Sequence, residues 1–198
     1  MLNADADYAQ IVSLLTKQQL APYVSYAKSD VVDGFGKHTG AGHVVVRVSD
    51  GTIVSGDSSG IEAGDYHDRS NPVSHPTFVA ACYRAVTETA DTYAGRPALK
   101  LTLVPTCQSK PHDVDYPFTT LYADPQTLHP LDVSGTVKPT ADSKDVMVAL
   151  DQHFADFNGR VMPTQLKVDV SGSGWMFWLQ VHVTETYGDY QFLNSPSA

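Results

Sequence analysis

The sequence predicts an α+β protein that is mainly β: a curved antiparallel sheet with one N-terminal helix and one short helical segment. Most of the chain after residue 22 consists of runs in which apolar and polar residues alternate, which is typical of half-buried strands. Only residues 4–20 repeat apolar side chains convincingly at helical spacing. Some strands also carry large apolar residues on their second face, at Val45, Met176 and Trp178, so both faces of those strands need cover. We expect about ten strands curled around an apolar interior.

Length and composition limit the class of protein. A chain of 198 residues is the size of one large domain, so we expect a single domain over residues 1–198. Hydrophobic content of 42% and charged content of 18% argue against disorder. The net charge of -9 and the pI near 5.1 disfavour nucleic acid and anionic membrane surfaces as partners. No apolar run approaches the roughly 20 residues that a transmembrane helix needs.

The N-terminal helix is predicted by an apolar stripe and by its flanking residues. Asp5 and Asp7 lie near the helix N-terminus, where the helix dipole favours negative charge, and Pro22 ends the segment. The stripe comprises Tyr8, Ile11, Leu14 and Leu15.

The next elements are extended. Residues 23–29 form one expected strand, and residues 43–48 and 52–54 form a hairpin in which Asp50 and Gly51 suit a tight type I′ turn. Residues 56–75 are rich in Gly, Ser, Asp and Asn, and they predict a long excursion or flap. Residues 76–81 are expected to form a short helical turn.

The only two cysteines, Cys82 and Cys107, flank a second expected hairpin. Its strands, 83–93 and 97–105, meet at Ala94 and Gly95. If the register is regular, the cysteines are direct cross-strand neighbours at a separation that a disulfide can bridge. Two separate thiols are the alternative. A disulfide indicates an oxidising compartment, so we expect an extracytoplasmic protein, periplasmic or secreted, whose signal peptide has been removed.

The C-terminal half continues the strand pattern. Asp124 and Pro125 predict a type I turn after a strand that starts near residue 118, and Pro130 implies an edge or a bulge on the return strand. Further strands are expected over residues 146–150 and 166–170. A turn is expected at 171–174, and a last strand from Trp175 onward.

Two candidate catalytic patterns occur in the polar segment. Residues 56–60 match Gly-x-Ser-x-Gly, but the following residues are too few and too polar for the helix that a nucleophile elbow requires, which favours a flexible loop. Imidazole and carboxylate groups that could bind zinc also occur here, with a spacing that matches no known metal motif. They are Asp65, His67, Asp68 and His75.

Other candidates are weaker. A second group of His112, Asp113 and Asp115 is more typical of a solvated loop. Cys82 would lose both nucleophilicity and access as a disulfide partner. We therefore assign no catalytic residue, no metal ligand and no cofactor.

The order of elements resembles the outer-membrane lipoprotein carrier superfamily, which includes LolA-like, LppX-like and RseB-like domains. The resemblance covers most of the chain, and it rests on pattern: a leading helix, an extended segment with Tyr23 and Tyr26, and the hairpin over residues 44–54. It continues through ALKLTLVP, TTLYADPQTLHPLDVSG, MPTQLKVDV and WMFWLQVHV. The resemblance implies an incomplete antiparallel barrel, a half-barrel, with helices on its concave face. It also implies binding of acyl chains or lipoproteins outside the cytoplasm.

The leading functional prediction is a non-enzymatic binding protein that holds an apolar ligand, an acyl chain or lipoprotein, in the half-barrel. One alternative is an interaction or sensor module for an envelope protein, and another is a metal-dependent hydrolase that uses the His and Asp residues of 65–75. The residues expected to line the ligand site are Tyr26, Val46, Leu121, Trp175, Phe177 and Leu179.

Overall fold

The structure is a computed structural model, and it describes residues 3–34, 36–59, 72–73, 77–107, 117–137, 146–173 and 178–196. It contains helix α1, a short 3-10 helix η1 and ten strands. Their bounds are α1 Ala4–Thr16, β1 Tyr23–Asp33, β2 Lys37–Arg47, β3 Ile53–Ser59, η1 Ala80–Cys82, β4 Tyr83–Tyr93, β5 Arg96–Pro105, β6 Phe118–Ala123, β7 Pro130–Val137, β8 Val146–Asp156, β9 Val161–Ser173 and β10 Trp178–Leu193.

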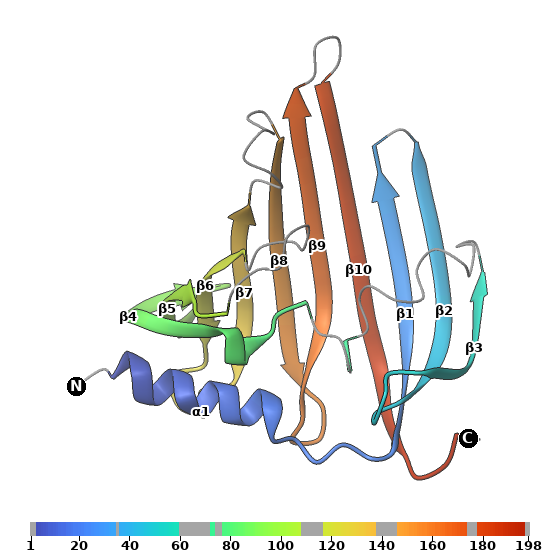
Figure 1. The fold of residues 1–198 in the computed structure, drawn as a ribbon, viewed down its shortest axis with the longest axis horizontal. Coiled ribbons are helices and arrows are strands. Elements are labelled where there is room, and N and C mark those ends of the chain that lie inside the picture. Colours follow the sequence, from blue (N-terminus) through green and yellow to red (C-terminus); the bar gives the residue numbers. More distant parts are fainter. Residues whose placement is uncertain are drawn as a thin grey trace.

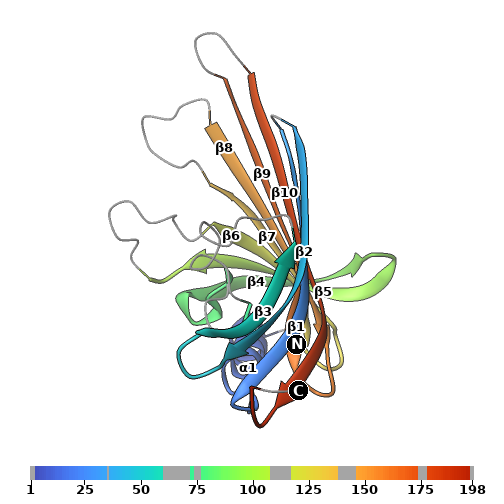
Figure 2. The same cartoon turned by 90° about the vertical axis from the view of Figure 1, so that its right-hand side faces the viewer.

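All ten strands belong to one antiparallel sheet in the order β3-β2-β1-β10-β9-β8-β7-β6-β5-β4. The N-terminal strand β1 therefore pairs with the C-terminal strand β10, while the other neighbours follow the chain. The sheet is curved and is not closed (Figures 1 and 2). These features confirm the predicted fold class of a mainly β, half-open antiparallel sheet with an N-terminal helix.

Helix α1 lies across one end of the concave face (Figures 1 and 2). It begins where the Asn3 side chain accepts a hydrogen bond from the Ala6 backbone, as a polar N-cap residue does. It ends at Thr16 instead of continuing to Leu20, and the Gln18 side chain donates to the Leu15 carbonyl, which satisfies an acceptor at the helix C-terminus. Among the described residues, no helix has both the length and the apolar character needed to cross a membrane.

Two apolar clusters pack on the concave face, and Val168 contacts both of them. The first lies under α1, and its buried members include Tyr8, Ile11, Phe78, Tyr83, Leu101, Phe118, Leu121, Val133, Leu150 and Phe154. The second lies on β1, β2, β9 and β10, and its buried members are Val24, Tyr26, Val46, Met162, Leu166, Tyr187 and Tyr190. That residues 1–198 form one domain stays a prediction.

The predicted disulfide between Cys82 and Cys107 is present. Ala94 and Gly95 both have positive φ, as a type I′ turn requires, and the register from Tyr93 and Arg96 is regular at first. A β-bulge then shifts the register between Ala85 and Thr87. The cysteines still lie with their Cα atoms 4.9 Å apart, within the usual range for a disulfide.

Other predicted boundaries need correction. The loop before β3 is longer than a two-residue turn, since Gly51 donates to the Arg47 carbonyl and β3 begins only at Ile53. The turn expected at 171–174 was placed too early, because β9 continues to Ser173 and β10 begins at Trp178. Pro130 lies beside a bulge on an interior strand, which confirms the second of the two predicted options.

Candidate functional site

The concave face contains an apolar cavity of about 140 Å³. The C-terminal end of α1, residues 72–73 and 78–81, and the adjoining ends of β8 and β9 enclose it. The lining residues are Leu15, Thr16, Gln18, Leu20, Pro72, Val73, Phe78, Val79, Ala80, Ala81, Phe154, Val161, Met162 and Pro163.

Aromatic packing and one buried hydrogen bond hold the walls in place. The Tyr8 hydroxyl donates to the Ala80 carbonyl at 2.8 Å, which ties η1 to the helix. Phe78 packs against Phe118 and Phe154, with ring centroids 5.3 Å and 6.4 Å away. Because helix, 3-10 turn and sheet are cross-linked in this way, the cavity is preformed and a ligand need not order it.

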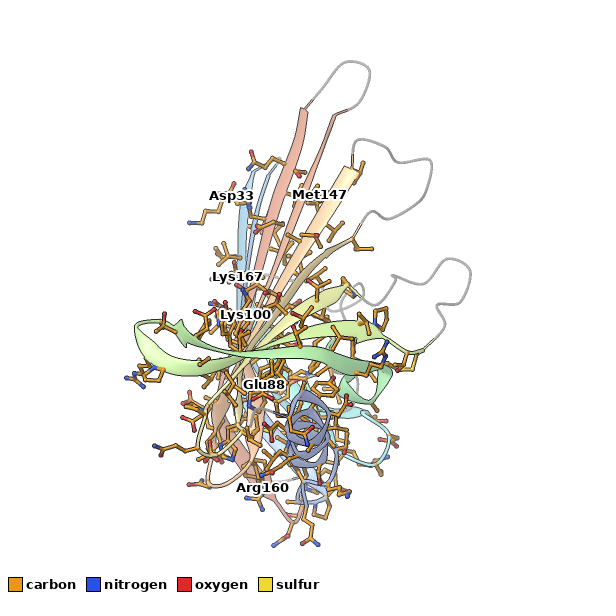
Figure 3. All side chains as sticks on the ribbon, turned by 90° about the vertical axis from the view of Figure 1, so that its left-hand side faces the viewer. Asp33, Glu88, Lys100, Met147, Arg160 and Lys167 are labelled. Atoms are coloured by element: carbon orange, nitrogen blue, oxygen red, sulfur yellow. A yellow bond between two sulfur atoms is a disulfide. The ribbon has the colours of Figure 1, made fainter. Side chains whose placement is uncertain are left out.

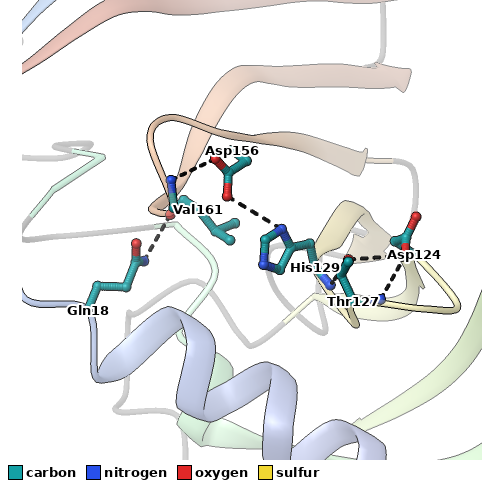
Figure 4. A network of polar contacts seen from close by, with 7 residues as sticks. Gln18, Asp124, Thr127, His129, Asp156 and Val161 are labelled. Atoms are coloured by element: carbon teal, nitrogen blue, oxygen red, sulfur yellow. Dashed lines mark hydrogen bonds and ion pairs between the residues drawn. The ribbon is translucent and has the colours of Figure 1, made fainter.

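Two polar side chains line the cavity. The Thr16 hydroxyl donates to the Val12 carbonyl at 2.7 Å and is therefore engaged within the helix. Gln18 Nε2 donates to the Val161 carbonyl at 2.9 Å (Figure 4). Gln18 Oε1 is buried and has no hydrogen-bond partner. Gln18 is therefore the lining residue that can accept a hydrogen bond from a ligand hydroxyl or amide.

The size and chemistry of the cavity define what it can hold. None of the described lining residues is charged, so the walls favour an uncharged group. An engineered apolar cavity of about 150 Å³ in another protein binds benzene, whereas sites for whole drug-sized ligands have volumes of about 300–1,000 Å³. A cavity of about 140 Å³ therefore fits one ring or the end of a chain, and not a whole lipid.

Nearby polar contacts fix the strand turn that borders the cavity. The Asp156 carboxylate accepts a hydrogen bond from the Gly159 backbone at 2.8 Å, and it lies 3.6 Å from His129 Nδ1 (Figure 4). Asn158 and Gly159 both have positive φ, which a tight turn between β8 and β9 requires. This turn sets the position of Val161 and Met162 in the cavity wall.

A buried group of charged residues lies beyond the second apolar cluster, where β1 pairs with β10. Lys28 Nζ is 3.5 Å from Asp30 and 3.6 Å from Glu185, and the Tyr187 hydroxyl donates to Glu185. Asp30 and Glu185 are each only 4% exposed. Desolvation raises the pKa of Asp30 above its ordinary value, and Lys28 opposes that increase.

The sequence did not single out this group, although a signal was present. Lys28 and Asp30 are two residues apart, so they lie on the same face of a strand as Tyr26. The alternation showed that they share a face. It did not show that this face is buried, since an alternating Lys-x-Asp pattern is also typical of a solvated face.

Three residues predicted to line the ligand site are described with their side chains: Tyr26, Val46 and Leu121. All three are buried in the apolar clusters, and none lines the 140 Å³ cavity. Leu179 pairs with Gly172 through its backbone, and its side chain lies outside the described residues, as do Trp175 and Phe177. The ligand role of these six residues stays a prediction.

The structure describes only part of the candidate catalytic patterns. Ser58 belongs to β3 and pairs with Gly42, so the segment is a strand there, and the prediction of a flexible loop was wrong for residues 56–59. A paired strand also lacks the sharp turn of a nucleophile elbow. The two groups of His and Asp residues in 65–75 and 112–115 lie outside the described residues.

The fold and cavity define a class of protein: an open antiparallel half-barrel with a helix and an apolar cavity on its concave face. No family model matches the sequence, and no curated protein matches it.

Some solved structures are similar to this chain at low sequence identity. A LolA superfamily protein from Nitrosomonas europaea has 8% identity and a TM-score of 0.45, covering 99% of this chain and 96% of that one. A putative outer membrane lipoprotein-sorting protein domain from Vibrio parahaemolyticus has 13% identity and a TM-score of 0.48, covering 96% and 93%. A chain of the MucA/MucB complex from Pseudomonas aeruginosa has 12% identity and a TM-score of 0.28, covering 95% of this chain and 95% of that one.

Proposed function

We propose that this protein is an extracytoplasmic, non-enzymatic binding protein that takes a short uncharged apolar group, such as the end of an acyl chain, into the concave face. The observation that carries the proposal is the 140 Å³ cavity with no charged residue in its described lining. The ligand would be part of a lipid or lipoprotein whose remaining atoms stay outside the cavity.

Burial of methylene groups supplies the affinity. Each methylene that leaves water contributes about 0.8 kcal/mol, so a chain end of a few carbons gives weak to moderate binding that does not depend on charge. Gln18 Oε1 can add one hydrogen bond to a hydroxyl or amide. The described lining residues include no titratable group for acid–base chemistry, which favours binding over catalysis.

The disulfide supports the proposed location. A bond between Cys82 and Cys107 persists in an oxidising compartment and is rare in the cytosol.

Calorimetric titration with 1-octanol tests the proposal, because this alcohol is uncharged and has an apolar chain. The Ala81→Phe variant places a ring at an exposed position of the cavity lining, and we expect it to weaken binding at least tenfold. The matched control is Ala90→Phe, an equal change at an exposed position of β4 outside the lining, which should bind as the wild type does. If the wild type takes up no octanol, or if both variants lose binding equally, the proposed site is wrong.

A further inference from the structure

Three potential metal ligands meet on the convex face of the sheet, opposite the apolar cavity. Asp132 of β7 pairs directly with His153 of β8, and Asp151 lies two residues before His153 on the same face. One ligand atom from each residue lies within 4.8 Å of the other two. The three side chains therefore converge on one point from two neighbouring strands.

Each of the three residues has a buried side-chain atom that lacks a hydrogen-bond partner. These atoms are Asp132 Oδ1, Asp151 Oδ1 and His153 Nε2. Asp132 is only 4% exposed, although its carboxyl group is polar. Folded proteins rarely leave one buried polar atom without a hydrogen-bond partner, so three such atoms in one cluster of residues indicate that something binds between them.

The His153 ring is held in an orientation suited to a ligand. Its Nδ1 lies 2.7 Å from the Tyr93 hydroxyl, at the end of the β4–β5 hairpin that projects on the convex side (Figure 2). When Nδ1 carries the proton and donates to Tyr93, the lone pair of Nε2 points toward the two carboxyl groups. A hydrogen bond from the second ring nitrogen is the usual arrangement around a histidine that binds a metal.

The lysines near the cluster do not pair with its carboxyl groups in the described part of the chain. Lys167 lies opposite Asp151 in the backbone register of β8 and β9, but no ion pair joins their side chains. Lys100 is 3.9 Å from Asp91 and lies over the Tyr122 ring. Both lysines are labelled in Figure 3. Within the cluster, His153 Nε2 lies 3.4 Å from Asp151 Oδ2.

We infer that Asp132, Asp151 and His153 form a binding site for one divalent transition-metal ion of the Zn²⁺ class. Two carboxylate oxygens and one imidazole nitrogen are a ligand set that suits zinc and similar ions, whereas magnesium and calcium prefer oxygen ligands alone. The positive ion would offset the repulsion between these two neighbouring carboxylates.

The surroundings leave room to complete the coordination. An open cleft of about 340 Å³ borders the cluster, and both Asp132 and Asp151 line it. Polar groups of Ser134 and Thr136 also face this cleft. With three protein ligands, the remaining position of a tetrahedral ion would hold water from the cleft.

A shared proton is the alternative occupant. If one carboxyl group is protonated, it can donate to the other, and the pair is then stable without any ion. The two possibilities differ in what happens when metal is added, because a protonated pair with no affinity for metal gives no stoichiometric binding.

Titration calorimetry of the full chain, stripped with a chelator and then titrated with ZnCl₂, tests the inference. We expect one site per chain, and at least tenfold weaker binding in both Asp132→Asn and His153→Gln. The control is His182→Gln, which removes an exposed histidine that contacts Asp169 on the same face, and it should leave the affinity unchanged. Circular dichroism confirms that each variant is folded.

A second measurement concerns Tyr93 as a positioning residue. Tyr93→Phe removes the partner of His153 Nδ1, and loss of such a partner weakens metal binding by roughly 10–100-fold. The absorption spectrum of bound Co²⁺ should change as well. A purely structural role of Tyr93 would not cause that spectral change. No stoichiometric binding by the wild type, unchanged affinity in Asp132→Asn, or an equal loss in His182→Gln would each overturn the inference.

Discussion

Cys82 and Cys107 are joined by a disulfide across the β4–β5 hairpin, although a β-bulge between Ala85 and Thr87 separates them from the regular register at the turn. The bulge leaves the exposed Val86 unpaired, and beyond it Tyr83 pairs with Pro105. The Cys82 carbonyl accepts hydrogen bonds from Thr106 and Cys107, which keeps the two cysteines adjacent. The bulge thus changes which backbones pair without separating the two sulfurs.

Removal of this disulfide should lower stability. A loop closed over a sequence separation of 25 contributes about 3 kcal/mol in the chain-entropy model, so Cys82→Ser with Cys107→Ser should lose about that much. Urea unfolding with and without a reducing agent measures it. The double variant should not respond to the reductant, while the wild type should fall to the variant's level. An unchanged unfolding midpoint in the reduced wild type would contradict this expectation.

Gly135 should tolerate no side chain. A Cβ atom there would lie 1.9 Å from the backbone oxygen of Pro117, and backbone cannot move away as a flexible side chain can. Gly135→Ala should therefore destabilise the protein by about 2 kcal/mol or more. Gly188→Ala is the matched control, because a Cβ at Gly188 meets nothing within 4 Å. Equal unfolding midpoints for the two variants would show that β6 and β7 are not this close.

Lys28 should be essential to the buried charged group on the concave face. Its Nζ lies within 3.6 Å of both Asp30 and Glu185, and Lys28→Met would leave two buried carboxyl groups without this cation. Removing one partner from a buried ion pair costs about 3–5 kcal/mol. Lys100→Met removes an ion pair whose side chains are about 40% exposed, so it should cost less than about 1 kcal/mol. Chemical denaturation of both variants measures the difference.

Asp132 should make stability depend on pH in the metal-free protein. Desolvation, followed by the neighbouring Asp151, raises the pKa of Asp132 to about 8, while Lys167 opposes the increase. Between the ordinary aspartate pKa and about 8, the unfolded chain is ionised at this position and the folded chain is protonated. The folded state then binds more protons, so the free energy of unfolding falls as pH rises through this range.

The side chain of the Asp132→Asn variant cannot ionise, so the free energy of unfolding of this variant should fall less as pH rises. One pKa unit corresponds to about 1.4 kcal/mol, so between pH 5 and pH 8 the variant's free energy of unfolding should fall by at least about 2 kcal/mol less than that of the wild type. Denaturation in EDTA across this pH range measures both slopes. Parallel slopes would mean that Asp132 is ionised in the folded protein at neutral pH.

The sequence by itself determined the elements and the links between neighbouring ones. Helical spacing predicted α1, alternation predicted the strands, and Ala94-Gly95 predicted the hairpin that brings the cysteines together. These features depend on backbone preferences and on residues close along the chain, so local patterns are sufficient to predict them. The incomplete barrel was predicted from a resemblance in the order of elements, and not from any local rule.

The tertiary structure alone decided which faces are buried and which distant groups meet. Alternation shows that Lys28 shares a face with Asp30, and Asp151 with His153, but not whether that face meets water or core. The placing of α1 and residues 78–81 against the ends of β8 and β9 determines where the cavity forms. Asp132 meets His153 only because β7 and β8 pair in one register, and a shift of one residue would send one of them to the other face.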